Sequence, residues 1–573
     1  MPKVSLRGKL WNWTGFRSRE DQITILLSLV IGVIVGLTVV AFILLTGRLA
    51  ARMYPPERAV WRRLLVPVVG TLVSGYLLFK HFPNARGSGI PQTKFALFIQ
   101  DGYIGLKTVI GKFVCCSISL ASGIALGREG PSVQIGAGIA SVLGRHYGLS
   151  NEKVKALVPV GCSAALAAAF NTPIAAVLFS LEEILGDLHA PVIGSVVLSS
   201  ATSWIVLHLI LGDEPLFHVP AYQLVNPLEF GIYAVLGIVG GLTSVCFVKL
   251  LLGLRIWFRQ FPSSTTWLQP VAGGLLMGLF ALVRPEVLGV GYDYVDRVLT
   301  GDFPWKIVLV LGVMKIIATP ACYSSGNAGG IFGPSLFVGA MVGGSVGYAA
   351  HTLLPNVTAN PGAYALVGMG TAFAGIVRTP LTSVIMIFEM TRDYSIIVPL
   401  MISNLISFFT SQQLQREPIY EALALQEGVY LPTGESREEL EGVRTIEVML
   451  RDVDPLPASA NPAEAKARFE LEQCHAWPVG DRNNLIGIIS SRQIETATDP
   501  PQTIGELVGN SRDYPFIHSD HPVSYALERM GSNGLDAIPV VSRANIHQMF
   551  GVVRLADILS KYGVAGIPGV YAK

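Results

Sequence analysis

The sequence predicts an all-α polytopic membrane domain followed by a smaller, water-soluble α/β module, and its composition and charge distribution support both parts. Of 573 residues, 51% are hydrophobic and only 14% are charged, whereas soluble domains carry about 25% charged residues. The mean hydropathy of +0.50 excludes a wholly soluble globular protein. Residues 427–573 hold 13 Lys and Arg and 20 Asp and Glu. The tail therefore carries a formal charge of −7 and the body +9.

The first apolar stretch lies close to the N-terminus. Basic residues precede a run of 23 residues from Ile23 to Leu45. This run is long enough to cross about 30 Å of hydrocarbon and too long for a signal-peptide core. Its basic flank predicts a cytoplasmic N-terminus. We therefore expect a cytoplasmic segment over residues 1–21 and a membrane domain over residues 22–425.

Further apolar blocks follow along the body, and several are interrupted by Gly and Pro. They lie at about 62–79, 104–126, 154–185, 191–212, 230–255, 267–283, 306–321, 331–350, 362–390 and 395–412. Helix breaks at membrane depth are tolerated only where the freed backbone faces protein or a watery cavity. Broken segments at corresponding positions of two halves indicate a transport site.

The body contains such halves. The heptapeptide that begins at Pro131 recurs at Pro334, and the 13-residue segment that ends at Pro173 recurs at Pro380. The offsets, 203 and 207 residues, drift by only four. The alternative is a coincidence of Gly/Ala-rich composition. We interpret the body as a duplication, whose two copies occupy about 60–230 and 265–412.

Three short segments of the body combine glycines with a following proline. They are Gly87-Ser-Gly-Ile-Pro91, Gly127-Arg-Glu-Gly-Pro131 and Gly329-Gly-Ile-Phe-Gly-Pro334. Proline suits the first turn of a helix, and glycine lets a backbone approach a ligand closely. Each segment would present free N–H groups at the positive end of a helix dipole, which attracts an anion. The alternative is that these glycines only permit close helix packing, as we expect for Gly136, Gly138, Gly343, Gly344 and Gly347.

The two copies differ within this motif. The first carries Glu129 where the second carries Phe332, so the fold does not require a carboxylate there. An acidic side chain inside a membrane costs about 2.5–3.5 kcal/mol on insertion scales and indicates a function. Beside a helix N-terminus, Glu129 can take the place of a transported anion and leave when it is protonated. The alternative is an interfacial glutamate paired with Arg128.

The three motifs, in this order, resemble the signature of the CLC family of chloride channels and proton–chloride antiporters. Phe170-Asn-Thr-Pro173 and Pro285-Glu-Val-Leu-Gly289 add to the resemblance. It implies an inverted-repeat membrane fold and a homodimer in which each subunit has its own anion pathway. It also implies that Glu129 is the outward-facing gating glutamate.

The same resemblance implies a central chloride site. Hydroxyl groups of Ser88 and Tyr420 would contact the chloride, and the backbone N–H groups of Ile331 and Phe332 would complete the site. Serine at position 88 points to chloride, because nitrate-preferring members carry proline there.

A second glutamate bears on the choice between antiporter and channel. Glu183 corresponds to the internal proton-transfer glutamate of CLC antiporters, a position where channel members generally lack a carboxylate. Glu182 has an acidic counterpart in the other copy, Glu389, whereas Glu183 aligns with Met390. We therefore favour proton-coupled chloride antiport over a passive chloride channel. The alternative for Glu182 and Glu183 is a solvated acidic pair at the cytoplasmic end.

The tail contains two similar α/β segments, 444–494 and 511–561. Both are similar to CBS (cystathionine-β-synthase) domains, which pair and often regulate transporters by binding adenine nucleotides. The usual Gly-h-h-Ser/Thr-x-x-Asp motif (h, apolar) is incomplete in each. The first copy keeps Ser490 and the second keeps Asp557. ATP at the CBS pair, with a ribose contact from Asp557, is one hypothesis, and a purely structural dimerisation role is the other.

Other classes of protein are disfavoured. The six cysteines include no Cys-x-x-Cys pair and the ten histidines form no ligand-spaced cluster, so we predict no metal site. No phosphate-binding Gly-x4-Gly-Lys-Ser/Thr loop supports an ATP-driven pump, and no charge excess suggests nucleic acid. We expect a secondary transporter, not an enzyme, with no required cofactor, in a plasma or inner cell membrane with both termini cytoplasmic. A membrane-anchored nucleotide sensor is a third hypothesis.

Overall fold

The computed structural model describes residues 19–54, 60–213, 215–217, 219–220, 222, 224–301, 303–427, 443–496, 503–508 and 514–561. Residues 1–18 of the expected N-terminal segment lie outside the described residues. The chain divides into two compact units. The helical unit comprises residues 1–97 and 101–429, and the C-terminal unit comprises residues 98–100 and 430–573.

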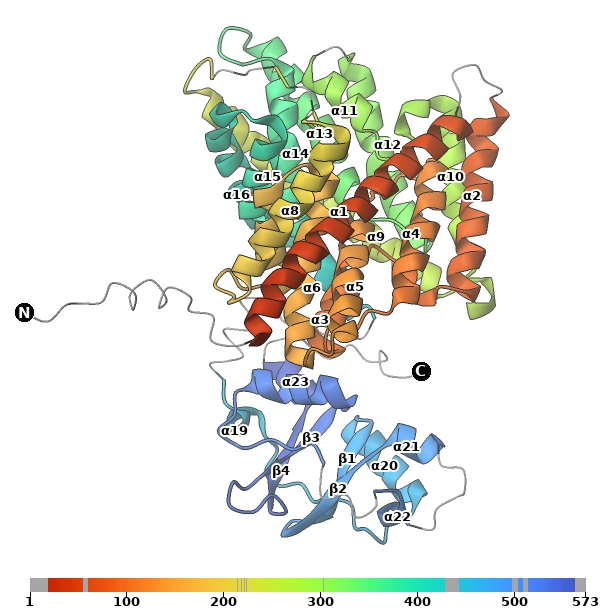
Figure 1. Cartoon of the computed structure of the whole chain (residues 1–573), viewed down its shortest axis with the longest axis vertical. Coiled ribbons are helices and arrows are strands. Elements are labelled where there is room, and N and C mark those ends of the chain that lie inside the picture. The colour runs from red at the N-terminus through yellow and green to blue at the C-terminus, as the bar shows by residue number, and fades with distance from the viewer. Residues whose placement is uncertain are drawn as a thin grey trace, which may run out of the picture. The chain divides into compact units, whose positions relative to one another are not determined.

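Helices make up the regular structure of the helical unit over its described residues (Figure 1). They are α1 (Arg19–Met53), α2 (Trp61–Lys80), α3 (Ile90–Ile99), α4 (Leu106–Ala121), α5 (Glu129–His146), α6 (Asn151–Phe170), α7 (Pro173–Phe179), α8 (Ile193–Leu211), α9 (Glu229–Arg259), α10 (Gln269–Val283), α11 (Tyr292–Leu299), α12 (Trp305–Ser324), α13 (Phe332–Leu353), α14 (Pro361–Val377), α15 (Pro380–Thr391), α16 (Ile397–Leu414) and α17 (Ile419–Leu425). A π-helical turn, η4 (Ser180–Leu185), follows α7. Short 3-10 turns lie at Pro83–Ala85, Ser263–Thr265, Pro285–Val287 and Tyr394–Ile396.

Several of these helices have membrane-spanning character. Among the described residues, eight helices are long and apolar enough to cross a membrane. The predicted first spanning helix is one of them and corresponds to α1. Shorter apolar helices include α10, α14 and α15. The expected blocks 154–185 and 362–390 are each broken into successive helices, as their internal prolines predicted.

The internal repeat is visible in the order of the helices. The series α4, α5, α6 and α7 recurs as α12, α13, α14 and α15. Both α6 and α14 end at a residue in the left-handed conformation, Asn171 (φ 60°) and Arg378 (φ 67°). A Thr-Pro pair follows each, and the proline begins the next helix, where its missing N–H leaves no intrahelical bond unmade.

The two copies cap each other's helices. The Glu389 carboxylate accepts the N–H groups of residues 174 and 175 at 2.9 and 2.7 Å. Reciprocally, the Glu182 carboxylate accepts the N–H groups of residues 381 and 382 at 3.3 and 2.8 Å. Each carboxylate thus compensates the positive dipole end of a helix in the other copy. Because each copy caps a helix of the other in the same way, the contacts between the copies have approximate two-fold symmetry.

Glycines allow the helices of each copy to pack closely. A Cβ atom on Gly136 of α5 would lie 2.3 Å from the carbonyl oxygen of Gly161 of α6. In the second copy, a Cβ on Gly343 of α13 would lie 2.1 Å from the Tyr364 oxygen of α14. Neither position can accept a larger residue without a shift of the backbone, so the packing role predicted for these glycines is confirmed.

The C-terminal unit contains two strand pairs with flanking helices. Strand β1 (Ala476–Asp481) pairs antiparallel with β2 (Asn484–Ser490), and β3 (Ala537–Val541) pairs antiparallel with β4 (Met549–Arg554). The helices are α19 (Thr445–Val448), α20 (Pro462–Glu472), α21 (Ser491–Thr496), α22 (Ile504–Val508), α23 (Val523–Asn533) and α24 (Leu555–Lys561). A core that includes Trp477, Ala537 and Val552 joins both copies.

One segment of the first copy pairs with the second. The backbone of Leu450 exchanges two hydrogen bonds, of 2.9 and 3.0 Å, with Val552 of β4. Helix α22, which lies between the two copies in the sequence, packs on β2, and the Ile504 N–H donates to the Ala460 carbonyl at 2.9 Å. The boundaries 444–494 and 511–561 therefore stay a proposal that describes the sequence.

The exchanged caps predict matched effects on stability. Glu182→Ala and Glu389→Ala should each lower the free energy of unfolding by about 1–2 kcal/mol, because each leaves helix-terminal N–H groups without an acceptor. Denaturant titration in detergent, followed by circular dichroism, measures this. The control is Glu152→Ala, which removes an exposed carboxylate and should cost less than about 0.5 kcal/mol. A large loss at one cap and none at the other would contradict the reciprocal role.

Candidate functional site

The three glycine-proline segments meet at one corner of the helical unit. Gly127 and Gly330 form an isolated antiparallel bridge, in which the N–H of each donates to the carbonyl of the other at 2.7 Å. They occupy equivalent positions in the two copies, so the bridge lies on the approximate two-fold axis. A Cβ on Gly130 would lie 2.6 Å from the Ser88 carbonyl oxygen and 3.3 Å from the Gly330 Cα atom. The starts of α3, α5 and α13 therefore adjoin one another.

Two hydroxyl groups predicted to contact an anion are buried without a partner. Ser88 and Tyr420 are 0% and 1% exposed, and neither hydroxyl makes a hydrogen bond of normal geometry among the described residues, although the Tyr323 phenol lies beside Ser88. Ser88 lies between two glycines with positive φ, Gly87 (82°) and Gly89 (106°), a turn that favours glycine on both sides. Burying a hydroxyl without an acceptor is costly, so the two groups indicate a ligand that accepts hydrogen bonds.

The predicted backbone donors lie at the start of α13. Ile331 and Phe332 are 0% and 1% exposed, and the first N–H groups of a helix have no acceptor within it. The Phe332 ring packs against Phe170 and Phe373, with centroid distances of 4.8 and 4.3 Å. This aromatic surrounding excludes water, and the helix-terminal partial charges act more strongly in such a medium.

Glu129 lies at this same helix start. Its carboxylate is 0% exposed and accepts the Gly333 N–H at 3.3 Å. Its other oxygen accepts the Tyr292 hydroxyl at 2.5 Å and lies 4.0 Å from the Arg128 guanidinium. The carboxylate therefore occupies the anion-attracting end of α13 and is fully buried within the protein. The sequence reasoning missed Tyr292.

Two buried lysines were also missed, although the repeat pointed to them. Lys112 and Lys315, separated by the repeat offset of 203, are both 0% exposed. The Lys112 ammonium donates to the carbonyls of Ala85 and Gly87 at 3.1 and 2.7 Å. Lys315 donates to the carbonyls of residues 287 and 289. Each lysine thus fixes the glycine turn of its own copy. The sequence contained a signal for both lysines, because each precedes the Gly-Pro motif of its copy, at Gly127 and Gly330, by the same number of residues.

Glu183 lies in a buried cluster of three charged side chains. It belongs to the π-helical turn η4, an irregularity frequent at functional sites. The Lys94 ammonium lies 2.9 Å from the Glu183 carboxylate and 3.6 Å from that of Glu421. All three residues are at least nine-tenths buried. Lys94 and Glu421 carry no motif in the sequence, so their role could be found only from the fold.

Tyr420 joins the proposed anion site to the charged cluster through the chain, because it directly precedes Glu421 in α17.

A polar cavity of 390 Å³ lies beside the Ser88 turn. Its lining includes Gly87, Tyr323 and three arginines, Arg86, Arg255 and Arg259. Glu427 also lines the cavity and pairs with Arg255. The arginines outnumber the single carboxylate, so the cavity attracts anions.

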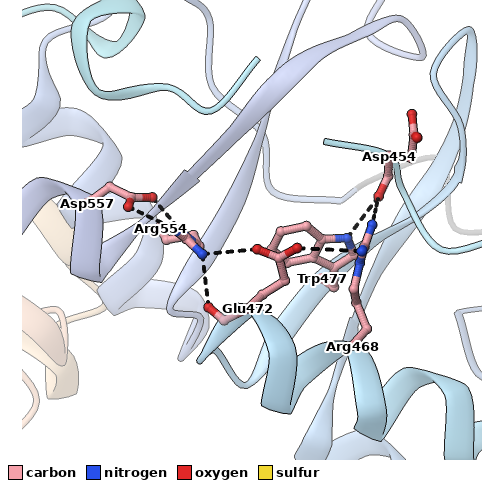
Figure 2. A network of polar contacts seen from close by, with 6 residues as sticks. All are labelled: Asp454, Arg468, Glu472, Trp477, Arg554 and Asp557. Atoms are coloured by element: carbon pink, nitrogen blue, oxygen red, sulfur yellow. Dashed lines mark hydrogen bonds and ion pairs between the residues drawn. The ribbon is translucent and has the colours of Figure 1, made fainter. Parts of the chain in front are cut away.

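Asp557 of the C-terminal unit is held by a neighbouring arginine (Figure 2). The Arg554 guanidinium donates to both Asp557 oxygens, at 2.7 and 2.8 Å, and to the Glu472 carboxylate at 3.0 Å. The Asp557 carboxylate raises the pKa of Arg554 above its usual value. In the first copy, the Ser490 hydroxyl instead contacts Gln493 at 3.0 Å. A ribose would therefore compete with Arg554 for Asp557, and nucleotide binding stays a prediction.

No group of three or more His, Cys, Asp or Glu side chains within the described part of the chain is arranged to hold a metal ion.

Comparisons with known proteins place this geometry in a family. The family model for voltage gated chloride channels matches residues 70–412, and the CBS domain model matches residues 504–563. The chain belongs to the voltage-gated chloride channel (CLC) family. It is accordingly an integral membrane protein with a CBS domain, and the predicted family and fold class are confirmed.

Curated relatives and a solved structure share most of the membrane domain. A putative chloride channel protein, ClcB-like, of Ralstonia nicotianae is 33% identical over 63% of this chain and 85% of its own length. The H(+)/Cl(−) exchange transporter ClcA of Vibrio campbellii is 33% identical over 61% of this chain and 76% of its own. A slow cyanobacterial Cl−/H+ antiporter has a similar crystal structure (TM-score 0.65, 26% identity), which covers 70% of this chain and 97% of the antiporter.

The unpartnered hydroxyls predict an unusual stability result. Without a bound anion, Ser88→Ala and Tyr420→Phe should leave the unfolding free energy unchanged or slightly raised, because neither hydroxyl makes a hydrogen bond of normal geometry to the described residues. Ser203→Ala is the matched control, since the buried Ser203 hydroxyl donates to the Ala164 carbonyl at 2.6 Å. That variant should lose about 1 kcal/mol. Thermal unfolding in detergent with a bulky organic counter-anion compares the three. Equal losses for Ser88→Ala and Ser203→Ala would assign Ser88 a structural role.

Proposed function

We propose that this protein is a proton-coupled chloride antiporter, which exchanges chloride for protons through a pathway in each subunit. The observation that carries the proposal is the buried Glu129 carboxylate at the N-terminus of α13. This acid occupies a place built from helix-terminal N–H groups, which suits an anion. The relatives named as an exchange transporter and an antiporter support the same conclusion.

The anion site is formed without a full positive charge. The Ser88 and Tyr420 hydroxyls and the N–H groups of Ile331 and Phe332 are the donors that we assign to chloride. Dipolar donors bind a halide firmly enough to strip its water and weakly enough to release it. The arginine-lined cavity beside the Ser88 turn supplies a positive approach to this site.

The proton route uses two acids. When Glu129 is protonated it loses its attraction for the α13 start and leaves, and chloride takes its place. Glu183 passes the proton to or from the opposite side, with Lys94 balancing its charge when it is ionised. Because chloride and the ionised Glu129 compete for one position, movement of one depends on the state of the other.

The second candidate function is a passive chloride channel, as the name of the Ralstonia relative suggests for that protein. The Glu183 cluster favours antiport. Glu182, the adjacent acid, has a capping role that its counterpart Glu389 repeats, whereas Glu183 has a buried counter-charge and no acidic counterpart. A carboxylate buried in this way needs a role other than helix capping, and proton transfer supplies one.

The proposals for oligomeric state, membrane and orientation rest on the charge distribution and on the family. We propose a homodimer in the plasma or inner membrane of the cell, with both termini cytoplasmic. The −7 tail then lies on the same side as the basic N-terminal flank. No cofactor is required for exchange, and ATP at the CBS pair, with Asp557 as ribose contact, stays a hypothesis for regulation.

Coupled flux in liposomes tests the proposal. An outward chloride gradient imposed on protein-containing liposomes should drive protons inward against their own gradient, seen as a change in an internal pH dye. An uncoupler added later should collapse the proton gradient. Chloride efflux without uphill proton movement would establish the channel instead.

Substitution of each acid should separate the two fluxes. Glu129→Gln should abolish proton movement while chloride flux continues at an equal or higher rate, since a neutral amide no longer competes as an anion. Persistence of proton coupling in this variant would remove Glu129 from the route.

Glu183→Gln should stop protons while chloride continues. The matched control is Glu182→Gln, which changes the neighbouring acid that caps α15 and should keep proton coupling. Ion-selective electrodes record both fluxes in the same sample. If both variants lost proton coupling equally, the loss would come from a disturbed η4 turn, and the specific role of Glu183 in proton transfer would be contradicted.

A further inference from the structure

Tyr292 is the first residue of α11 and contacts the gating acid from the second repeat. Its hydroxyl donates to the Glu129 carboxylate at 2.5 Å. A hydrogen bond from a neutral donor to an ionised acceptor is roughly twice as strong as a neutral pair. Of the two hydrogen-bond donors that the described residues supply to Glu129, the Gly333 N–H belongs to the anion site itself. Tyr292 is the donor supplied by a side chain.

The tyrosine is held in position by its neighbours. Its ring makes an edge contact with Phe217, with the centroids 5.6 Å apart. The Arg128 guanidinium lies 5.8 Å from the ring centroid, a cation–π arrangement. A Cβ on Gly333 would lie 2.7 Å from the Tyr292 hydroxyl oxygen, so the hydroxyl is wedged against the start of α13.

The repeat shows that the fold does not require a tyrosine here. Lys112 and Lys315 fix equivalent glycine turns, at residues 87 and 289. Counting from these turns, Tyr292 corresponds to Ile90 of the first copy. The first turn delivers Ser88 to the proposed anion site, and the second delivers a hydroxyl to the acid that competes with the anion.

We propose that Tyr292 is a positioning residue that holds the ionised Glu129 carboxylate at the start of α13 and thereby sets how acidic the medium must be to release it. This inference rests on the proposed function. The donor bonds more strongly to the ionised carboxylate than to the neutral acid, so it favours the seated, ionised gate. Another charged group that lies against Glu129 among the described residues is Arg128, at 4.0 Å. It stays in place when only the Tyr292 hydroxyl is removed.

The test is the pH profile of chloride efflux from liposomes that contain full-length protein. Tyr292→Phe should move the midpoint of acid activation to higher pH by about one unit, and raise the rate near neutral pH several-fold. The matched control is Tyr222→Phe, which removes a buried hydroxyl that donates to the Leu299 carbonyl and not to Glu129. Its profile should match the wild type.

A second background separates positioning from a structural effect. In Glu129→Gln protein the gate carries no ionisable group, so adding Tyr292→Phe should change neither rate nor pH dependence. A shift that persists in this background, or an unshifted profile in Tyr292→Phe alone, overturns the proposal. Tyr292→Ile introduces the residue that the first copy carries at this position, and it serves if the Phe variant does not fold.

The outcome is distinguishable from failure of the antiport proposal. If the wild-type protein moves chloride but pumps no protons, antiport is wrong, yet the pH profile of its chloride flux still decides whether Tyr292 controls Glu129. If the wild-type protein pumps protons and Tyr292→Phe leaves the profile unchanged, antiport stands and the positioning role falls.

Discussion

The reciprocal hydrogen bonds between Gly127 and Gly330 are the constraint on which the site depends. A Cβ atom on Gly127 would lie 3.1 Å from the Gly333 nitrogen, and one on Gly330 would lie 3.0 Å from the Gly130 nitrogen, so neither position accepts a side chain without a shift of its neighbours. Because the two glycines are equivalent in the repeat, their pairing brings the start of α5 against the start of α13 by symmetry. The Ser88 turn then packs against Gly130 and adds a third helix start. An anion-attracting corner follows from backbone geometry alone, before any functional side chain is considered.

Function arises where the two copies stop being alike. Glu182 and Glu389 keep the same capping role in both copies and hold the helices in register. Glu129 and Glu183 have no acidic counterparts in the second copy. The equivalent residues there are Phe332 and Met390. A duplicated scaffold therefore allows structural and functional acids to be told apart inside one chain, since the fold has already been built once without the functional ones.

The sequence predicted the fold class, the repeat and the glycine-proline helix starts because each leaves a local pattern. It also singled out Glu129, Glu183 and Ser88, which lie within or beside those patterns. It did not predict Tyr292 or the Lys94–Glu421 contact. Tyr292 lies in a second-copy turn that has lost its proline, and Lys94 reaches Glu421 from 327 positions away. Such contacts depend on how distant helices cross in the folded protein, and this crossing cannot be predicted from the spacing of residues in the sequence. In the C-terminal unit, likewise, the sequence showed an incomplete motif at Asp557 but not that Arg554 engages it.

The bonds of Glu129 also join the two halves of the membrane domain. This side chain belongs to the first copy, and the hydrogen-bond donors that the described residues offer it, Tyr292 and Gly333, belong to the second. Protonation of Glu129 thus weakens hydrogen bonds between the two copies, and it also vacates a position that an ion can occupy. A single proton would then have a mechanical effect, easing the grip between halves that are otherwise tied by their glycine bridge and exchanged caps.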